Sequence, residues 1–204
     1  PCPMQWELTT DRPETVADSI AFPCIHGPGT NHLDSFAHMF FGGKMWNGYS
    51  RNLVTKQGGA AKVSILTMKS GIVTRAVLYD IPRLKGVPYL EPGTRIYAED
   101  LEAWEKMAGV KVSPGDAVFI RTGRWALRAK VGPSSGPGGQ AGLDASVIPW
   151  VRQRDIALMG SETALTVTPI PSTTTITDPD DYLPIHNFVL VALGMPLIDA
   201  ADLD

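Results

Sequence analysis

The distribution of hydrophobic positions along the chain predicts strands that alternate with helices after residue 60. Segments 61–68 and 72–81 are rich in β-branched residues and bounded by glycines, so both are expected to be strands. Residues 116–123 and 155–161 are further apolar runs of strand length, and 20–25 is a shorter one. Strands in alternation with helices are typical of the α/β class, here with a mixed sheet.

Three segments have the character of helices. Over 98–109, apolar residues recur at helical spacing behind an acidic first turn, and Gly109 is a typical helix end. A second helix is expected around 145–153. The apolar run 185–193 follows Pro184, and proline is favoured at the first position of a helix.

Loops are expected to make up much of the chain. The sequence has 20 glycines and 17 prolines, more than an average protein of its length. Segments 132–144 and 168–184 have the composition of loops. No repeat and no linker divides the sequence, so residues 1–204 are expected to form a single domain. Such a composition suits a site built from loops on a rigid sheet.

Composition and charge exclude several classes of function. A formal net charge of −3 lacks the excess of Lys and Arg that nucleic-acid binding needs. No apolar run reaches the roughly 18 residues of a membrane span. The two cysteines, Cys2 and Cys24, form no C-x-x-C pair and no disulfide framework, and Cys24 is expected to be a small buried hydrophobic residue. No signal peptide is recognisable, so the expected location is the cytoplasm.

The most unusual segment is 26–38, HGPGTNHLDSFAH, which holds three of the four histidines. If 30–34 is extended, the side chains of His32 and Asp34 point to the same face, about 6.6 Å apart along the strand, and can converge on one cation. The sequence between His26 and His32 is typical of a sharp reversal, which could return His26 to the same ion. Imidazole with carboxylate suits Zn²⁺, Mn²⁺ or Fe²⁺ without choosing among them.

His38 is harder to place in the same site. On a straight strand it would lie about 13 Å beyond Asp34, too far to share an ion with that residue. It reaches the site only if the chain bends at 35–37, or if it faces the site from the far side as a base, a role that suits an imidazole pKa of about 6.5. The alternative interpretation of the whole window is a group of surface or core histidines without a ligand.

Two charged residues at the ends of predicted strands are further candidates. Glu162, in GSET, is either a site residue or a solvated loop acid. Arg121, near the end of the strand predicted at 116–123, is placed where it could meet an anionic product.

The histidine window resembles the signature H-x-G-T-H-x-D-x-P-x-H of the metal-dependent cyclase family, which includes bacterial kynurenine formamidases and isatin hydrolases. The matching residues, in order, are His26, Gly29, Thr30, His32, Asp34 and His38. Four further stretches resemble motifs of that family: GKMWNG (43–48), LKGVPYLEPGT (84–94), SPGDAVFIRTG (113–123) and HNFVLVALGMPLID (186–199). The chain departs from the signature in having two more residues between the first two histidines, and Phe36 in place of the proline.

The resemblance implies a fold and a set of ligands. The implied fold is the swivelling β/β/α domain, a mixed sheet closed towards a barrel with helices outside. The implied ligands of one or two divalent ions, Mn²⁺ or Zn²⁺, are His26, His32, Asp34, His186 and Asp199, the last in place of a glutamate of the family. His38 is the implied catalytic residue, and no substrate-binding residue is assigned. Relatives form dimers or tetramers, so a homodimer or homotetramer is expected.

The expected reaction is hydrolysis of a carbon–nitrogen amide bond in a small molecule, either an aryl formamide or a cyclic amide. A metal-activated water would attack the carbonyl, and His38 would take the proton and deliver one to the leaving nitrogen. Two alternatives stay open: a metal-dependent lyase or cyclase acting on a sugar or a polyketide, and a non-catalytic binding protein on the same scaffold. Hydrolysis adds one water to the product, and the binding protein would lack tight metal binding.

Overall fold

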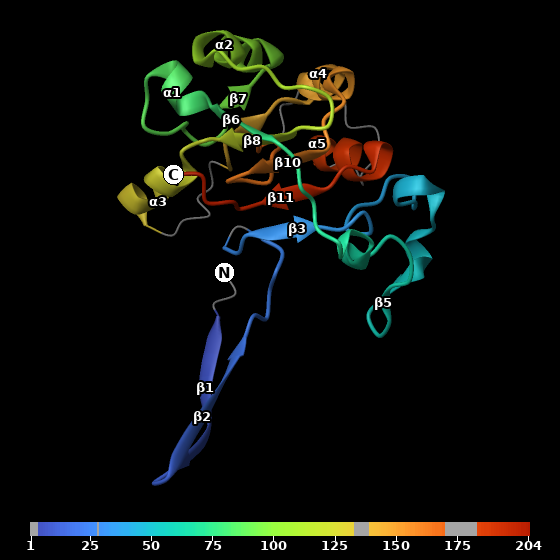
Figure 1. The fold of residues 1–204 in the computed structure, drawn as a ribbon, viewed down its shortest axis with the longest axis vertical. Helices are drawn as coiled ribbons and strands as arrows, with labels where there is room; N and C mark the ends of the chain where they lie inside the picture. The colour runs from blue at the N-terminus through green and yellow to red at the C-terminus, as the bar shows by residue number, and fades with distance from the viewer. Residues whose placement is uncertain (1–3, 28, 133–138, 170–182) are drawn as a thin grey trace.

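The computed structural model describes residues 4–27, 29–132, 139–169 and 183–204, which form a body and a projecting hairpin (Figure 1). The body is built on a five-stranded sheet in the order β3-β11-β10-β8-β6. The strands are β3 (His32–Asp34), β6 (Ala76–Asp80), β8 (Ala117–Arg121), β10 (Leu158–Ser161) and β11 (Leu197–Asp199). Neighbours pair in parallel except β3, which is antiparallel to β11. The mixed α/β architecture predicted from the sequence is therefore confirmed.

The sheet is open over the described parts of the chain. β3 and β6 are its two edges, and they do not pair with each other. The expected closure towards a barrel is thus not made by these five strands. Two small pairs lie outside the sheet: β7 (Arg95–Ile96) with β9 (Gly142–Leu143), and β4 (Val54–Thr55) with β5 (Gly59–Ala60).

Helices pack around the sheet, with α1 and α2 beside the β6 edge (Figure 1). The α-helices are α1 (Ile81–Lys85), α2 (Ala98–Ala108), α3 (Arg124–Val131), α4 (Ile148–Arg154) and α5 (Pro184–His186), and α5 continues into the π-helix η5 (Asn187–Leu193). Short 3₁₀ turns complete the body: η1 (Trp46–Gly48), η2 (Arg51–Leu53), η3 (Ile65–Met68) and η4 (Ala145–Val147).

The pairing of the strands shows which side chains share the buried face of the sheet, from β6 at one edge to β3 at the other. Residues directly opposite each other in a sheet point to the same face. Tyr79 on β6 pairs with Ile120 on β8, and both are at most 1% exposed. Met159 of β10 pairs with Leu197 of β11, and Leu197 pairs with Asp34 of β3. The side chain of Asp34 therefore belongs to the buried face of the sheet.

Most of the helices and strands expected from the sequence are present. The helix expected over 98–109 is α2, which ends at Ala108 with Gly109 in the left-handed conformation (φ 66°). The helix expected around 145–153 is formed by η4 and α4. Strands β6, β8 and β10 lie inside the segments predicted for them, and helix α5 has Pro184 as its first residue. Most of the predicted loop 168–184 falls outside the described residues.

Two predicted strands are wrong. Segment 61–68 does not join the sheet but ends in η3, and Leu66 is 70% exposed there. Strand propensity describes a fit to a half-buried pleated surface, which this segment does not meet. Segment 20–25 is strand only at its start, because β2 ends at Ala21.

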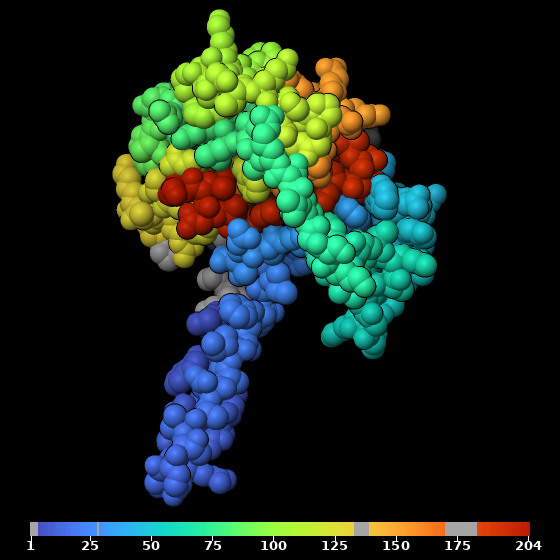
Figure 2. Space-filling view, viewed as in Figure 1, coloured from blue at the N-terminus to red at the C-terminus, as the bar shows by residue number. Residues whose placement is uncertain are grey.

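A hairpin of β1 (Gln5–Arg12) and β2 (Thr15–Ala21), not predicted from the sequence, projects from the body (Figures 1 and 2). Trp6 pairs directly with Ile20, so the alternating side chains of both strands place a set of large apolar residues on one face. Their exposed fractions lie between 48% and 66%: Met4, Trp6, Leu8, Val16, Ile20 and Phe22. No described part of the chain covers this apolar face.

Cys24, which follows the hairpin, is half-buried and disulfide-bonded, so its expected role as a small buried hydrophobic residue is wrong. Disulfides persist mainly in oxidising compartments, and this residue therefore gives no support to a cytoplasmic location. Among the described residues, no helix combines the length and the apolar character needed to cross a membrane.

Candidate metal centre

All four histidines of the chain converge on the carboxylate of Asp34, which is fully buried. Its Oδ1 lies 3.1 Å from Nε2 of His26 and 3.6 Å from Nε2 of His32. Its Oδ2 lies 3.7 Å from Nε2 of His186 and 3.9 Å from Nε2 of His38. Each carboxylate oxygen therefore faces two imidazole nitrogens.

The edge of the sheet positions the first part of this cluster. His32 and Asp34 are alternate residues of β3, and the antiparallel pairing with β11 puts Asp199 opposite His32. The Nδ1 of His32 lies 2.7 Å from the carbonyl oxygen of Thr30. A proton on Nδ1 donates to that carbonyl and leaves the lone pair of Nε2 directed at the site.

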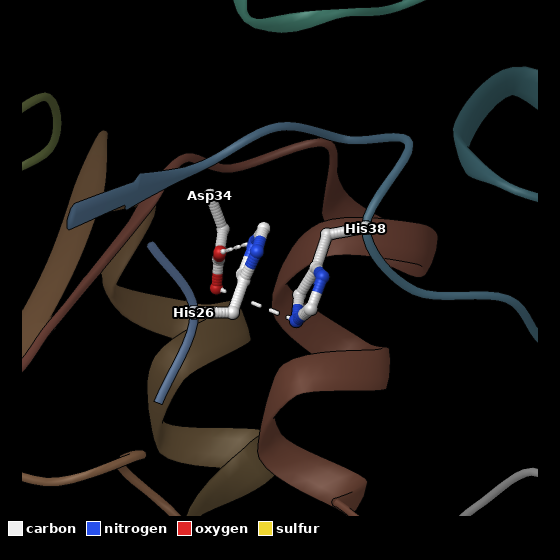
Figure 3. Close-up of side chains that lie close together, drawn as sticks. All are labelled: His26, Asp34 and His38. Atoms are coloured by element: carbon white, nitrogen blue, oxygen red, sulfur yellow. Dashed lines mark ion pairs between the residues drawn. The ribbon is translucent and has the colours of Figure 1, made fainter. Parts of the chain in front are cut away.

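A tight turn brings His38 back to Asp34 (Figure 3). The amide of His38 donates to the carbonyl of Ser35 at 3.0 Å, and the amide of Ala37 donates to the Ser35 hydroxyl at 3.2 Å. Phe36, which stands where the family signature has proline, is buried and lies 5.3 Å from the Trp46 ring. The bend that the sequence left open therefore exists, and the Phe36 side chain holds it against the body.

His26 completes the cluster from the solvent side. Its ring stacks on the ring of His38, with centroids 4.2 Å apart and an angle of 10° between the planes (Figure 3). Its side chain is 56% exposed. The longer spacing between His26 and His32 thus does not keep His26 from the site.

His186 and Asp199 join the cluster from distant parts of the sequence. His186, the last residue of α5, places Nε2 3.1 Å from Oδ2 of Asp199 and 3.7 Å from Oδ2 of Asp34. Both residues are buried. The shorter carboxylate of Asp199 therefore reaches the position that the resemblance assigned to a glutamate.

The donor set fits a divalent cation. Potential ligand atoms of His26, Asp34 and His38 lie within 4.8 Å of one another, and so do those of His32, Asp34 and Asp199. Asp34 belongs to both groups, so one or two ions held there would share its carboxylate. Neither oxygen of Asp34 has a hydrogen-bond partner among the described residues, and the same holds for Oδ1 of Asp199. Buried carboxylates without partners are costly unless a cation compensates them.

The pKa shifts of Asp34 and His38 also fit a cation site. Burial, together with the nearby carboxylate of Asp199, raises the pKa of Asp34. Burial, together with the charges of His26 and His186, lowers the pKa of His38 to about 4. His38 is therefore a neutral imidazole near pH 7, with a lone pair that can bind a metal or accept a proton.

Glu162 and Arg121 have structural roles in the fold. Glu162 is buried, and its Oε2 accepts the amide hydrogens of Thr122, Gly123 and Arg124 at 2.6 to 3.1 Å. It is thus neither a solvated loop acid nor one of the residues grouped around Asp34, but it holds the start of α3. Arg121 donates to Asp80 at 3.0 Å and to Asp204 at 2.6 Å, so these two carboxylates occupy its guanidinium group.

Comparisons with known proteins place this geometry in a family. The Cyclase family model matches residues 6–166. A solved structure described as a novel cyclase has a TM-score of 0.78 and 24% identity, covering 97% of this chain and 68% of its own. Isatin hydrolase A from Ralstonia solanacearum has a TM-score of 0.61 and 18% identity, and the match covers 98% of this chain and 70% of the isatin hydrolase. A predicted metal-dependent hydrolase from Bacillus stearothermophilus has a TM-score of 0.54 and 13% identity, and the match covers 98% of this chain and 71% of that hydrolase. No curated protein matches.

Replacing Asp34 by asparagine should abolish metal binding, because the variant removes the charge that both groups of candidate ligands share. Metal content per chain, measured by elemental analysis after dialysis against Mn²⁺ or Zn²⁺, is expected to be one or two in the original protein and near zero in Asp34→Asn. Asp202→Asn removes an exposed carboxylate near the C-terminus and should keep the original metal content. Equal metal content in Asp34→Asn and Asp202→Asn would contradict the assignment.

Proposed function

Since this chain belongs to the cyclase family, we propose that it is a metal-dependent hydrolase that cleaves a carbon–nitrogen amide bond of a small molecule. The observation that carries the proposal is the buried carboxylate of Asp34 with four histidine nitrogens within 3.9 Å. The substrate class is an aryl formamide or a cyclic amide. The likeness of the fold to isatin hydrolase A supports the cyclic amide, because isatin is itself a cyclic amide.

The proposed metal ligands are His26, His32, Asp34, His186 and Asp199, which would hold one or two Mn²⁺ or Zn²⁺ ions. A divalent ion in such a site supplies Lewis acidity towards a carbonyl oxygen and lowers the pKa of a coordinated water. The buried residues His32, Asp34, His186 and Asp199 exclude bulk water from one side of the site, which strengthens electrostatic interactions there.

His38 is the proposed acid–base residue. Its imidazole is neutral near pH 7, so Nε2 can accept a proton and later deliver it to the leaving nitrogen. The turn at 35–37 holds the ring beside Asp34 without covering it, and the side chain is 27% exposed. A substrate can therefore approach this ring from solvent.

Hydrolysis itself is tested by the mass of the product. The metal-loaded protein is incubated with an aryl formamide, a cyclic amide and, as controls for the alternatives, a sugar acid and a polyketide-like diketone. Amide hydrolysis adds one water to a cyclic amide, or splits a formamide into formate and an amine. A product with the mass of the substrate, or with one water less, would favour the lyase or cyclase. Absence of tight metal binding, together with no turnover of any class, would favour the non-catalytic binding protein.

His38→Ala should keep the metal content of the original protein and lower kcat by roughly 10²- to 10⁴-fold, the usual contribution of a positioned acid–base group. Metal content and the rate of amide hydrolysis are measured on the same preparation. His38 also lies in the ligand group of His26 and Asp34. Loss of one ion per chain in His38→Ala would therefore show that His38 is a ligand, and would contradict its role as the base.

We also propose that the protein is a homo-oligomer, a dimer or a tetramer. The apolar face of the β1–β2 hairpin is exposed, and a two-stranded hairpin is only marginally stable without a packed face. The body of the same chain exposes a second apolar set: Ile65, Leu66, Ile72 and Val73. Figure 2 shows that the hairpin stands clear of the body, so two copies related by a two-fold axis can cover each other's apolar surfaces.

The pair of changes Trp6→Glu and Ile20→Glu should convert the oligomer to a monomer, because each places a charge at the centre of the apolar face. The mass in solution, measured by light scattering after size exclusion, reports the change. Gln5→Glu places one negative charge on the opposite face of the same hairpin and should leave the mass unchanged. A monomeric original protein, or an oligomer that survives both glutamates, would contradict the proposal.

A further inference from the structure

The apolar face of the β1–β2 hairpin also carries negative charge. Asp18 pairs directly with Leu8, and Asp11 pairs directly with Val16. Side chains of directly opposed residues point to the same face of a sheet, so both aspartates lie among the exposed apolar residues of the hairpin. Arg12 is the one basic residue in 4–25, and because it follows Asp11 in the strand its side chain points to the other face.

A second surface of the chain has the opposite charge. Residues 41–73, named the basic lobe from this point on, contain five Lys or Arg residues and no Asp or Glu. Figure 1 shows this lobe projecting from the body, with β5 near its tip. All five basic residues are exposed, and none forms an ion pair within 4–27, 29–132, 139–169 and 183–204: Lys44, Arg51, Lys56, Lys62 and Lys69.

The exposed apolar residues of the basic lobe lie between two of these lysines in the sequence. Ile65 and Leu66 begin the 3₁₀ helix η3 and are 41% and 70% exposed. Lys62 precedes η3 by three residues, and Lys69 follows its last residue directly. The lobe therefore combines apolar side chains with charge as the hairpin does, but the sign of the charge is reversed.

Charge distinguishes between the ways in which two copies can associate. Two hairpins packed face to face would bring together the two aspartates of each, and two basic lobes would bring together ten Lys and Arg residues, five from each. Like charges that meet across an interface disfavour association, and opposite charges favour it. The tips of the hairpin and the lobe of one chain stand apart in Figure 2. A contact of opposite charges between these surfaces therefore requires a second copy.

We propose that the apolar face of the hairpin docks on the basic lobe of a second copy, with Asp11 and Asp18 beside Lys62 and Lys69 of that copy. This inference rests on the proposed homo-oligomer and names the two surfaces that meet in it. A two-fold axis makes the contact twice and closes the dimer. Burial of the apolar residues supplies affinity, and the charges select the hairpin-on-lobe arrangement over the two like-on-like arrangements.

Charge reversal on each surface tests the docking. A hairpin variant carries Asp11→Lys and Asp18→Lys, and a lobe variant carries Lys62→Glu and Lys69→Glu. Each variant turns attraction into repulsion in both contacts of the dimer, so each should weaken self-association by at least about tenfold. The dissociation constant is measured by sedimentation over a dilution series. A lobe variant that associates as tightly as the original protein would overturn the proposal.

An equimolar mixture of the two variants should associate again. In the mixed dimer, the new lysines of one hairpin meet the new glutamates of the other copy's lobe. The unchanged aspartates of the second hairpin meet the unchanged lysines of the first copy's lobe. Both contacts are then attractive, although each variant alone has two repulsive ones. A mixture that stays as weakly associated as its components would overturn the proposal.

Matched controls change the same kinds of residue elsewhere. Glu7→Lys with Ser19→Lys adds two lysines to the other face of the hairpin, where these residues pair with each other. Lys106→Glu with Lys111→Glu reverses two exposed lysines at and beyond the end of α2, at the opposite end of the body from the basic lobe (Figure 1). Neither control should change the dissociation constant.

Salt provides an independent measurement. An increase in NaCl from about 0.1 M to about 1 M shortens the Debye length from about 10 Å to about 3 Å, so it should weaken the hairpin-on-lobe dimer. Tighter association at high salt would indicate a contact between like charges and overturn the proposal. A chain that is monomeric at every concentration would refute the oligomer itself, whereas an oligomer insensitive to the charge reversals would refute only the docking. Neither result bears on the proposed hydrolysis, which the mass of the product tests.

Discussion

The buried carboxylate of Asp34 is the constraint on which the rest of the site depends. This carboxylate is fully buried and has no hydrogen-bond donor among the described residues, which is unfavourable in a protein interior, and the neighbouring Asp199 makes it more so. Four imidazoles from three parts of the chain face its oxygens at 3.1 to 3.9 Å. The fold brings together groups that repel or lack partners in the absence of a cation, and this arrangement is what a metal site requires.

The sequence was sufficient to predict the part of the site that depends on local geometry. The alternation of a strand places His32 and Asp34 on one face, and the structure has them on the buried face of β3. His186 and Asp199 could be assigned only through the family resemblance, because the contact between them requires α5 and the return of the chain into β11. The reach of His38 depends on packing between Phe36 and Trp46, which no local pattern reveals.

The elements that the sequence did not predict are those whose environment is unusual. The hairpin alternates apolar and polar residues as a half-buried strand would, yet both faces are exposed in the single chain. Helix α3 follows β8 almost directly, and its start depends on the side chain of Glu162, which lies about forty residues later in the sequence. Segment 61–68 has the composition of a strand, but it pairs with no strand in the described part of the chain.

The position of His26 has a thermodynamic consequence. This candidate ligand lies a few residues beyond the end of β2, and its exposed ring is joined to the body through the segment that carries the hairpin. Anything that fixes the hairpin reduces the freedom that His26 must lose when an ion binds. In the proposed oligomer, metal binding and the association of copies would by linkage strengthen each other by the same factor. The apparent metal affinity of such an oligomer would depend on the protein concentration, and a dilute solution would release metal that a concentrated one retains.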